Sequence, residues 1–160
     1  MKKIFCMLLC LVMLGSLLTA CGDDSKMKSY TYQDVTIQVP SSLKEDKDTI
    51  SGTGFSFCLS SNSIIVIGLH EDVSILGDDF TVEDYVDLMV EANSLDAKLE
   101  KHNGRTVFVY TAEVGVEFTY MGCSYKVGDE VWTIQAYTPT SAYSKNKDTL
   151  VEIVTSAEFN

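Results

Sequence analysis

The chain has 160 residues and a mass of 17.7 kDa, which is enough for one domain. Lys and Arg total 12 against 23 Asp and Glu, so the formal net charge is −11 and the pI is near 4.4. A surface this acidic repels phosphate backbones and excludes nucleic acid as a partner. Hydrophobic residues make up 46% and charged residues 22%, which excludes a disordered chain, and five Cys are too few for a disulfide scaffold.

The N-terminal segment has the pattern of a secretory signal. Lys2 and Lys3 precede an apolar stretch from Ile4 to Leu18, which is interrupted only by a Gly and a Ser. This stretch is shorter than the roughly 20 residues that a membrane-spanning helix needs. A short basic start, an apolar centre and a small residue at the end are typical of a signal peptide. We therefore expect residues 1–20 to be removed.

The end of this segment reads Leu18-Thr19-Ala20-Cys21. It resembles the lipobox of bacterial lipoproteins, and the resemblance implies that Cys21 carries a diacylglyceryl thioether and becomes the mature N-terminus. Two acyl chains give stable membrane anchoring, whereas one does not. The alternatives are an uncleaved anchor helix or an ordinary signal with an incidental Cys. The segment is similar to signals of Gram-positive gut Firmicutes, which implies the outer face of a single membrane; the Gram-negative periplasm is the alternative.

Residues 21–28 are small and polar, which predicts a flexible tether, and we expect a single domain over residues 29–160. Removal of Lys2 and Lys3 leaves 10 basic residues against 23 acidic ones, a charge of −13. Anionic lipid headgroups repel such a surface. We therefore expect the lipid on Cys21, and not the domain surface, to hold the protein at the membrane.

The first half of the domain shows strand patterns. Val35, Ile37 and Val39 alternate with polar residues before Pro40, and Tyr30 and Tyr32 precede them in the same rhythm. The polar stretch 41–54 predicts a loop. Two more strands are expected, at 55–60 with alternating Phe and Leu, and at 64–67, where every position is apolar as in a strand covered on both faces.

After residue 80 the spacing of the apolar residues changes from that of a strand to that of a helix. Thr81 followed by Asp84 predicts an N-terminal capping box, and apolar residues at helical spacing extend to near Asn93. Asn103-Gly104 predicts a tight hairpin between strands at 99–102 and 106–111. A second hairpin and a closing helix follow, with strands at 114–125 and 131–137 around Gly128-Asp129, and the helix at 145–156.

This order predicts an α+β domain with a mostly antiparallel, twisted sheet of six to seven strands and helices packed on its faces. The pattern resembles the Mog1/PsbP-like family in the segments VTIQVP, TVEDYV and HNGRTVFVYT, in the long strand pair and in the C-terminal helix. The resemblance covers residues 29–159 and implies an α/β/α sandwich. Members of that fold bind unrelated partners, so the resemblance implies no activity and no site residues.

Nucleophilic chemistry finds little support. The sequence has no Gly-x-Ser-x-Gly motif, and its two histidines, His70 and His102, fall at predicted strand ends, where we expect them to be solvated. Cys58 and Cys123 could form a disulfide outside the cell, or they could be two buried thiols. Without a CxxC motif or a nearby His, we expect neither Cys to be catalytic.

Metal and phosphate sites find no matching motif in the sequence. Six carboxylates lie within 14 positions and could bind Ca²⁺, but they lack the spacing of a calcium loop, and four of them surround a predicted helix start where negative charge is favoured: Glu71, Asp72, Asp78, Asp79, Glu83 and Asp84. No His/Cys cluster suits zinc. Gly52-Thr53-Gly54 matches no nucleotide-binding motif and predicts a loop. We therefore expect no metal and no cofactor.

Aromatic residues gather late in the chain: Tyr120, Tyr125, Trp132, Tyr137 and Tyr143. On an exposed sheet face they could bind sugars or peptides, whereas in a strand pair they would be core and edge residues.

Three function classes remain. The favoured one is a non-catalytic, lipid-anchored binding or accessory module at the outer face of the cell membrane, acting on a membrane complex or an extracellular ligand. The alternative is a lipoprotein that binds a small ligand, namely a carbohydrate, a peptide or Ca²⁺. A small surface hydrolase is less favoured, because no motif supplies both a base and a nucleophile.

Overall fold

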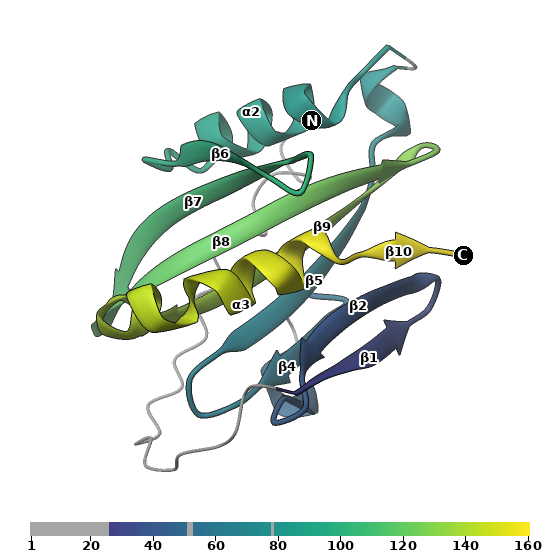
Figure 1. The fold of residues 1–160 in the computed structure, drawn as a ribbon. Coiled ribbons are helices and arrows are strands. Elements are labelled where there is room, and N and C mark those ends of the chain that lie inside the picture. The colour runs from purple at the N-terminus through teal and green to yellow at the C-terminus, as the bar shows by residue number, and fades with distance from the viewer. Residues whose placement is uncertain (1–25, 51–52, 78) are drawn as a thin grey trace.

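In the computed structural model, residues 26–50, 53–77 and 79–160 are described, and their strands form two antiparallel sheets (Figure 1). The larger sheet has seven strands in the order β3-β4-β5-β9-β8-β7-β6, and the smaller has three in the order β1-β2-β10. The large sheet comprises β3 (Lys44–Glu45), β4 (Phe57–Ser60), β5 (Ile65–Asp72), β6 (Lys98–His102), β7 (Arg105–Val114), β8 (Val116–Val127) and β9 (Glu130–Pro139). The predicted α+β class is confirmed, and the larger sheet has seven strands, within the predicted six to seven.

The small sheet joins the two ends of the domain. β1 (Met27–Tyr32) and β2 (Val35–Pro40) form a hairpin whose turn places Gln33 at a positive φ of 52°. β10 (Glu158–Phe159) pairs with β2 from the other side. β1 starts inside the predicted tether 21–28, because the Met27 side chain packs against the core.

Glycine-containing turns connect the long strands of the large sheet. Asn103 and Gly104, with φ of 50° and 76°, connect β6 to β7, as the sequence predicts for an Asn-Gly hairpin. Gly115 and Gly128, both at positive φ, lie in the turns on either side of β8. Gly122 in β8 leaves room for the Phe108 ring, which occupies the place where a Cβ would lie.

The helices match their sequence signals. α2 (Val82–Ala92) begins with the predicted capping box, in which the Thr81 side chain accepts from the Asp84 amide and the Asp84 carboxylate accepts from the Thr81 amide. α3 (Tyr143–Thr155) covers the predicted C-terminal helix. The predicted loop 41–54 was wrong in part, because it holds β3 and the single-turn helix α1 (Lys47–Ile50). β10 was not predicted, since two residues carry no period.

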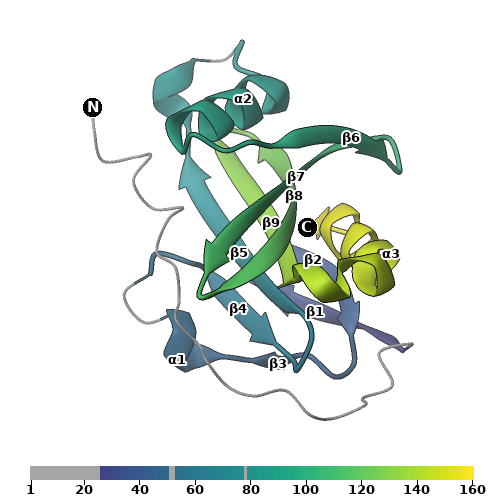
Figure 2. The same ribbon diagram turned by 90° about the vertical axis from the view of Figure 1, so that its left-hand side faces the viewer.

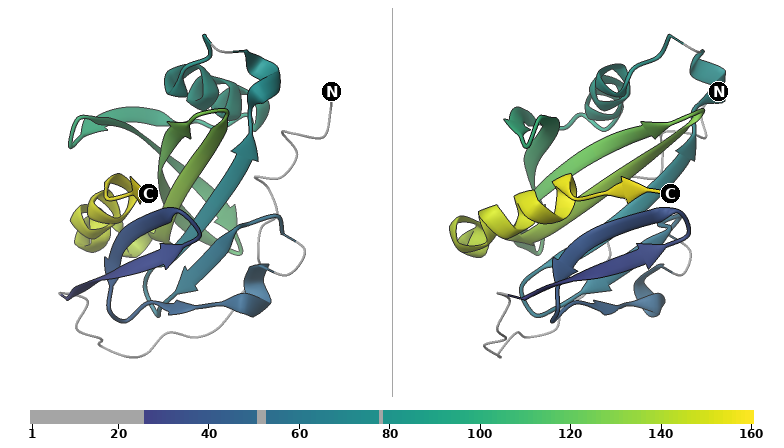
Figure 3. Two further views of the ribbon diagram at one scale, coloured as in Figure 1. Left: turned by 90° about the vertical axis from the view of Figure 1, so that its right-hand side faces the viewer. Right: turned by 45° about the vertical axis from the view of Figure 1, so that its right-hand side comes forward.

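The two faces of the large sheet are covered differently. On the first, α3 and the small sheet pack together, as Figure 3 shows, and Leu150 and Ile153 of α3 are completely buried. We call this the covered face. On the opposite side α2 packs at one end of the sheet, with Tyr85 and Met89 against Phe108, as Figure 2 illustrates. We call this second side the open face.

Candidate functional site

The candidate site lies where β7 and β8 separate. The two strands pair from Val114 and Val116 as far as Val107 and Cys123. Beyond that point β7 continues with β6, whereas β8 continues with β9 to Val127. The strands therefore form a fork, and the divergence is visible in Figure 1.

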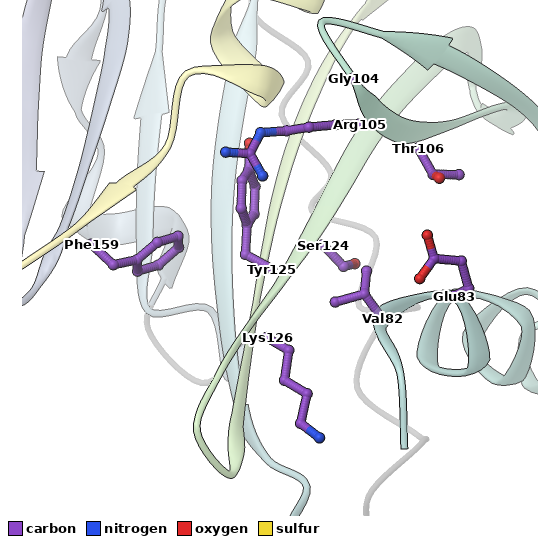
Figure 4. Close-up of a pocket in the computed structure, with 9 residues that line it drawn as sticks. All are labelled: Val82, Glu83, Gly104, Arg105, Thr106, Ser124, Tyr125, Lys126 and Phe159. Carbon is purple, nitrogen blue, oxygen red and sulfur yellow. The ribbon is translucent and has the colours of Figure 1, made fainter. Parts of the chain in front are cut away.

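The fork holds a pocket of about 360 Å³, which lies at the small end of the range for ligand sites (Figure 4). β7 and the turn before it contribute one side, the start of α2 another, and β8 and β10 the rest. The lining residues are Val82, Glu83, Gly104, Arg105, Thr106, Ser124, Tyr125, Lys126 and Phe159. Residues from four distant parts of the sequence thus meet in one pocket.

Arg105 is the single arginine of the sequence. Its guanidinium carbon lies 4.5 Å from the centre of the Tyr125 ring, a cation–π contact that orients the group. The Tyr125 hydroxyl donates to the Val154 carbonyl at 2.5 Å, which fixes the ring against α3. Within the described parts of the chain, no carboxylate oxygen comes within 4.0 Å of the Arg105 guanidinium.

Glu83 lines the opposite side of the same pocket, on the first turn of α2. Its ion-pair partner is Lys101, at a distance of 4.0 Å between Nζ and Oε1, with side chains 70% and 65% exposed. Such a long, exposed pair contributes little stability. In Figure 4 the Glu83 carboxylate lies near Thr106, across the pocket from Arg105. The pocket therefore has a cationic side and an anionic side.

Lys126 has a structural role in this pocket. Its Nζ donates to the Phe80 carbonyl at 2.6 Å, which ties the residues before α2 to β8. Figure 4 shows the side chain extending away from Arg105. Ser124, on the same strand, is buried, and its hydroxyl lies 2.9 Å from that of Thr133. These contacts hold the floor and the α2 side of the pocket in place.

A row of stacked tyrosines lies on the open face. The ring centres of Tyr110 and Tyr120 are 4.9 Å apart and nearly parallel, and those of Tyr120 and Tyr137 are 4.6 Å apart. The buried Gln135 amide donates to the Tyr110 hydroxyl at 2.9 Å. Burial raises the pKa of Tyr110, Tyr120 and Tyr137, so all three are neutral hydroxyls at physiological pH.

The predicted aromatic cluster is divided by the sheet. Tyr120 and Tyr137 lie in the row on the open face, whereas Tyr125 and Trp132 are buried in the core of the covered face. Tyr143 begins α3 and packs against that same core. Alternation along β8 and β9 places neighbouring aromatics on opposite faces, so the five residues do not form a single platform.

Both histidines have carboxylate partners. His70 stacks on Trp132 at 4.3 Å between ring centres, and its Nε2 lies 3.1 Å from Glu130. His102 Nε2 lies 2.8 Å from Glu100 Oε2. This contact and a neighbouring lysine hold the pKa of Glu100 below its usual value. The two side chains are 26% and 27% exposed, so they are partly buried as well as partly solvated.

Cys58 and Cys123 are free, buried thiols. Cys58 lies in β4 with Ile67 and Leu69, whereas Cys123 lies in β8 within the core of the covered face. Two strands, β5 and β9, separate them in the sheet, and a disulfide needs Cα atoms within about 7 Å. The disulfide considered from the sequence is therefore not formed. Burial raises the pKa of the Cys58 thiol to about 12.

The acidic stretch has structural partners. Glu71 accepts from the Tyr85 hydroxyl, Asp72 accepts from the Ser74 amide, and Asp84 belongs to the capping box. Among residues 26–50, 53–77 and 79–160, no group of three or more His, Cys, Asp or Glu could hold a metal ion. Asp78 and Gly52 lie outside the described residues; Thr53 accepts from the Phe55 amide.

The predicted signal peptide 1–20 and the lipidation residue Cys21 also lie outside the described residues. Within the part of the chain that is described, no helix has the length and hydropathy needed to cross a membrane. Sequence reasoning named Glu83 only as part of the acidic stretch, and it missed Arg105, Thr106 and Phe159 as pocket residues. The sequence feature that could have indicated this pocket is Arg105, the single arginine of the chain, directly after the Asn-Gly turn.

No family model matches the sequence, and no curated protein matches it. Several solved structures, by contrast, match the structure of this chain. The PsbP protein of the cyanobacterium Synechocystis (CyanoP) has a TM-score of 0.56 at 10% identity, over 89% of this chain and 99% of the other. The Ran-binding protein Mog1p of Saccharomyces cerevisiae has 0.55 at 11% identity, over 84% and 95%. LpqN of Mycobacterium tuberculosis has 0.51 at 9%, over 84% and 91%. The chain therefore has the Mog1/PsbP-like fold that its sequence pattern resembles.

Proposed function

We propose that this protein is a lipoprotein, anchored through Cys21 at the outer face of the cell membrane, that acts as a non-catalytic binding or accessory module. The observation that carries the anchoring is the sequence Leu18-Thr19-Ala20-Cys21 at the end of a basic and then apolar segment. A diacylglyceryl group supplies the two chains that stable anchoring requires.

The position of the first strand fits this proposal. β1 begins at Met27, six residues after Cys21. An extended chain spans at most about 3.6 Å per residue, so the anchor would hold the domain within roughly 20 Å of the headgroups. A mature charge of −13 disfavours adhesion of the domain to anionic lipid, which leaves its surfaces available for a partner.

The structural neighbours support a binding role without naming a partner. One is described as a Ran-binding protein and another as a protein involved in cell envelope biogenesis. Identities of 9–11% carry the fold alone, and this fold serves unrelated partners.

The histidine environments favour binding over hydrolysis. A hydrolase needs a nucleophile within hydrogen-bond reach of its base. Within the described part of the chain, Nε2 of His70 and of His102 lies beside Glu130 and Glu100, and no hydroxyl or thiol hydrogen-bonds to either ring. The alternative of a small-ligand lipoprotein gains support from the pocket at the β7–β8 fork, where charged and apolar side chains converge.

The anchoring is tested by replacing Cys21 with Ser. Cells producing the wild type, Cys21→Ser or Cys10→Ser are fed a clickable palmitate analogue, and the purified protein is assayed for the label. We expect the wild type and Cys10→Ser to carry the label and Cys21→Ser to lose it, because the thioether and the amide acyl chain both require Cys21. Label retained on Cys21→Ser, or absent from the wild type, would overturn the anchoring.

The accessory role is tested by crosslinking in cells followed by mass spectrometry of the same three strains. A partner captured with the wild type and Cys10→Ser but lost with Cys21→Ser identifies a role at the membrane. A partner captured equally by all three would place the binding role in the domain, independent of the anchor.

A further inference from the structure

We infer that the fork between β7 and β8 binds a short free peptide, whose carboxylate contacts Arg105 and whose ammonium contacts Glu83. The inference rests on the proposed binding role and supplies its ligand class. Three features of the fork carry it: an open strand edge, two opposite charges that do not pair with each other, and an apolar surface between them.

The open edge belongs to β8. Residues Ser124 to Val127 pair with β9 on one side only, since the ladder between β7 and β8 ends at Cys123. At about 3.3 Å per residue these four residues extend over roughly 13 Å, which gives room for a peptide of two to four residues. An added extended segment can take up the backbone groups of such an edge, as in other cases of β-strand addition. A free amino acid is too short to use it.

The charges are arranged for a ligand with two opposite ends. Arg105 and Glu83 line one pocket but form no ion pair with each other, and among residues 26–50, 53–77 and 79–160 the ion-pair partner of Glu83 is Lys101, at 4.0 Å. The guanidinium is held over the Tyr125 ring, and its planar donors fit a carboxylate with two parallel hydrogen bonds. A ligand with one charge would be repelled by one side of the pocket, whereas a zwitterion is attracted by both.

The apolar surface fits an aliphatic side chain. Tyr125 and Phe159 pack together at 5.4 Å between ring centres, and Val82 faces the pocket from α2. Lys126 holds this part of α2 in position through the Phe80 carbonyl. The volume of about 360 Å³ limits the ligand to a small molecule. The net charge of −11 further disfavours polyanions such as nucleotides.

The test measures binding by isothermal titration calorimetry with the full-length lipoprotein purified in a neutral detergent. The probes are Leu-Leu, N-acetyl-Leu-Leu, which lacks the ammonium, Leu-Leu amide, which lacks the carboxylate, and free leucine. We expect Leu-Leu to bind most tightly. Each blocked probe should bind about fivefold more weakly, since both charged groups of the protein are exposed and screened. Leucine should bind more weakly still.

Variants assign each charge to its residue. Arg105→Gln should abolish the difference between Leu-Leu and Leu-Leu amide while keeping the preference for a free ammonium. Glu83→Gln should do the reverse. Lys145→Gln and Glu91→Gln, exposed charges on α3 and α2 outside the pocket, are the matched controls and should leave all four affinities unchanged. Far-UV circular dichroism verifies that each variant is folded.

Three results would overturn the inference: no binding of Leu-Leu at millimolar concentration, leucine binding as tightly as Leu-Leu, or equal effects of the pocket and control variants. The labelling of Cys21 is measured separately and requires no ligand. A failure of peptide binding with Cys21 still labelled therefore rejects the ligand class and leaves the anchored accessory role standing.

Discussion

Both faces of the large sheet bury apolar side chains, yet only one of them is completely covered. On the covered face, α3 and the three-stranded sheet enclose a core of aliphatic and aromatic residues with 0–5% exposure. On the open face, α2 covers one end, and the half-buried Tyr120 and Tyr137 continue beyond it. We interpret the covered face as the main source of stability. The start of α2, which packs at one end of the sheet, is where the structure leaves room for a pocket.

The largest expected difference in the free energy of unfolding comes from shortening one buried side chain on each of the two helices. Ile153→Ala on α3 should cost about 4 kcal/mol, because its site lies between two layers that cannot collapse into the cavity. Met89→Ala on α2 should cost about 2.5 kcal/mol, because α2 can shift on its solvent side. Urea unfolding at neutral pH measures both free energies. Equal costs would show that the two faces contribute alike.

A matched pair of tyrosines sharpens the comparison. Tyr125→Phe removes the hydrogen bond to the Val154 carbonyl beneath α3 and should cost about 1–1.5 kcal/mol. Tyr120→Phe on the open face keeps the ring stacking with Tyr110 and Tyr137 and should change stability by less than about 0.5 kcal/mol. Thermal unfolding of the two variants beside the wild type provides the measurement. A larger cost for Tyr120→Phe would mean that its hydroxyl is needed on the open face.

The smallest effect concerns acid. Hydrogen bonds from Thr81 hold the pKa of Asp84 below its usual value of about 3.9. A carboxyl whose pKa is lowered by folding stabilises the protein above its unfolded pKa, and that contribution is lost as the pH falls through the folded pKa. The free energy of unfolding should therefore fall below about pH 4 more steeply in the wild type than in Asp84→Asn. Identical slopes from pH 5 to pH 2.5 would contradict this role of the capping box at the start of α2.

Local sequence signals predicted much of the fold. The Asn103-Gly104 hairpin formed because this dipeptide adopts the left-handed conformation that the turn needs. The capping box from Thr81 to Asp84 begins α2 because its hydrogen bonds are made between neighbouring residues. Such contacts depend on a few adjacent positions, so a single sequence is sufficient to predict them.

Contacts between distant segments could not be predicted in this way. β10 is two residues long and exists because Glu158 and Phe159 meet the edge of β2, more than 100 residues earlier. Cys58 and Cys123 share a sheet but lie in different cores. The five late aromatics were grouped by sequence position, whereas strand alternation divided them between the two faces.

The sequence by itself determined the signal-like N-terminal segment, the acidic charge, the order of strands and helices and the α+β class, because each depends on composition or short-range periodicity. Only the tertiary structure decided where β7 leaves β8, and hence that Arg105 and Glu83 lie across one pocket without pairing. The physical reason is the fork itself. The β7–β8 ladder ends at Cys123 because β7 continues with β6 while β8 continues with β9, and pairing between distant strands leaves no local pattern in the sequence.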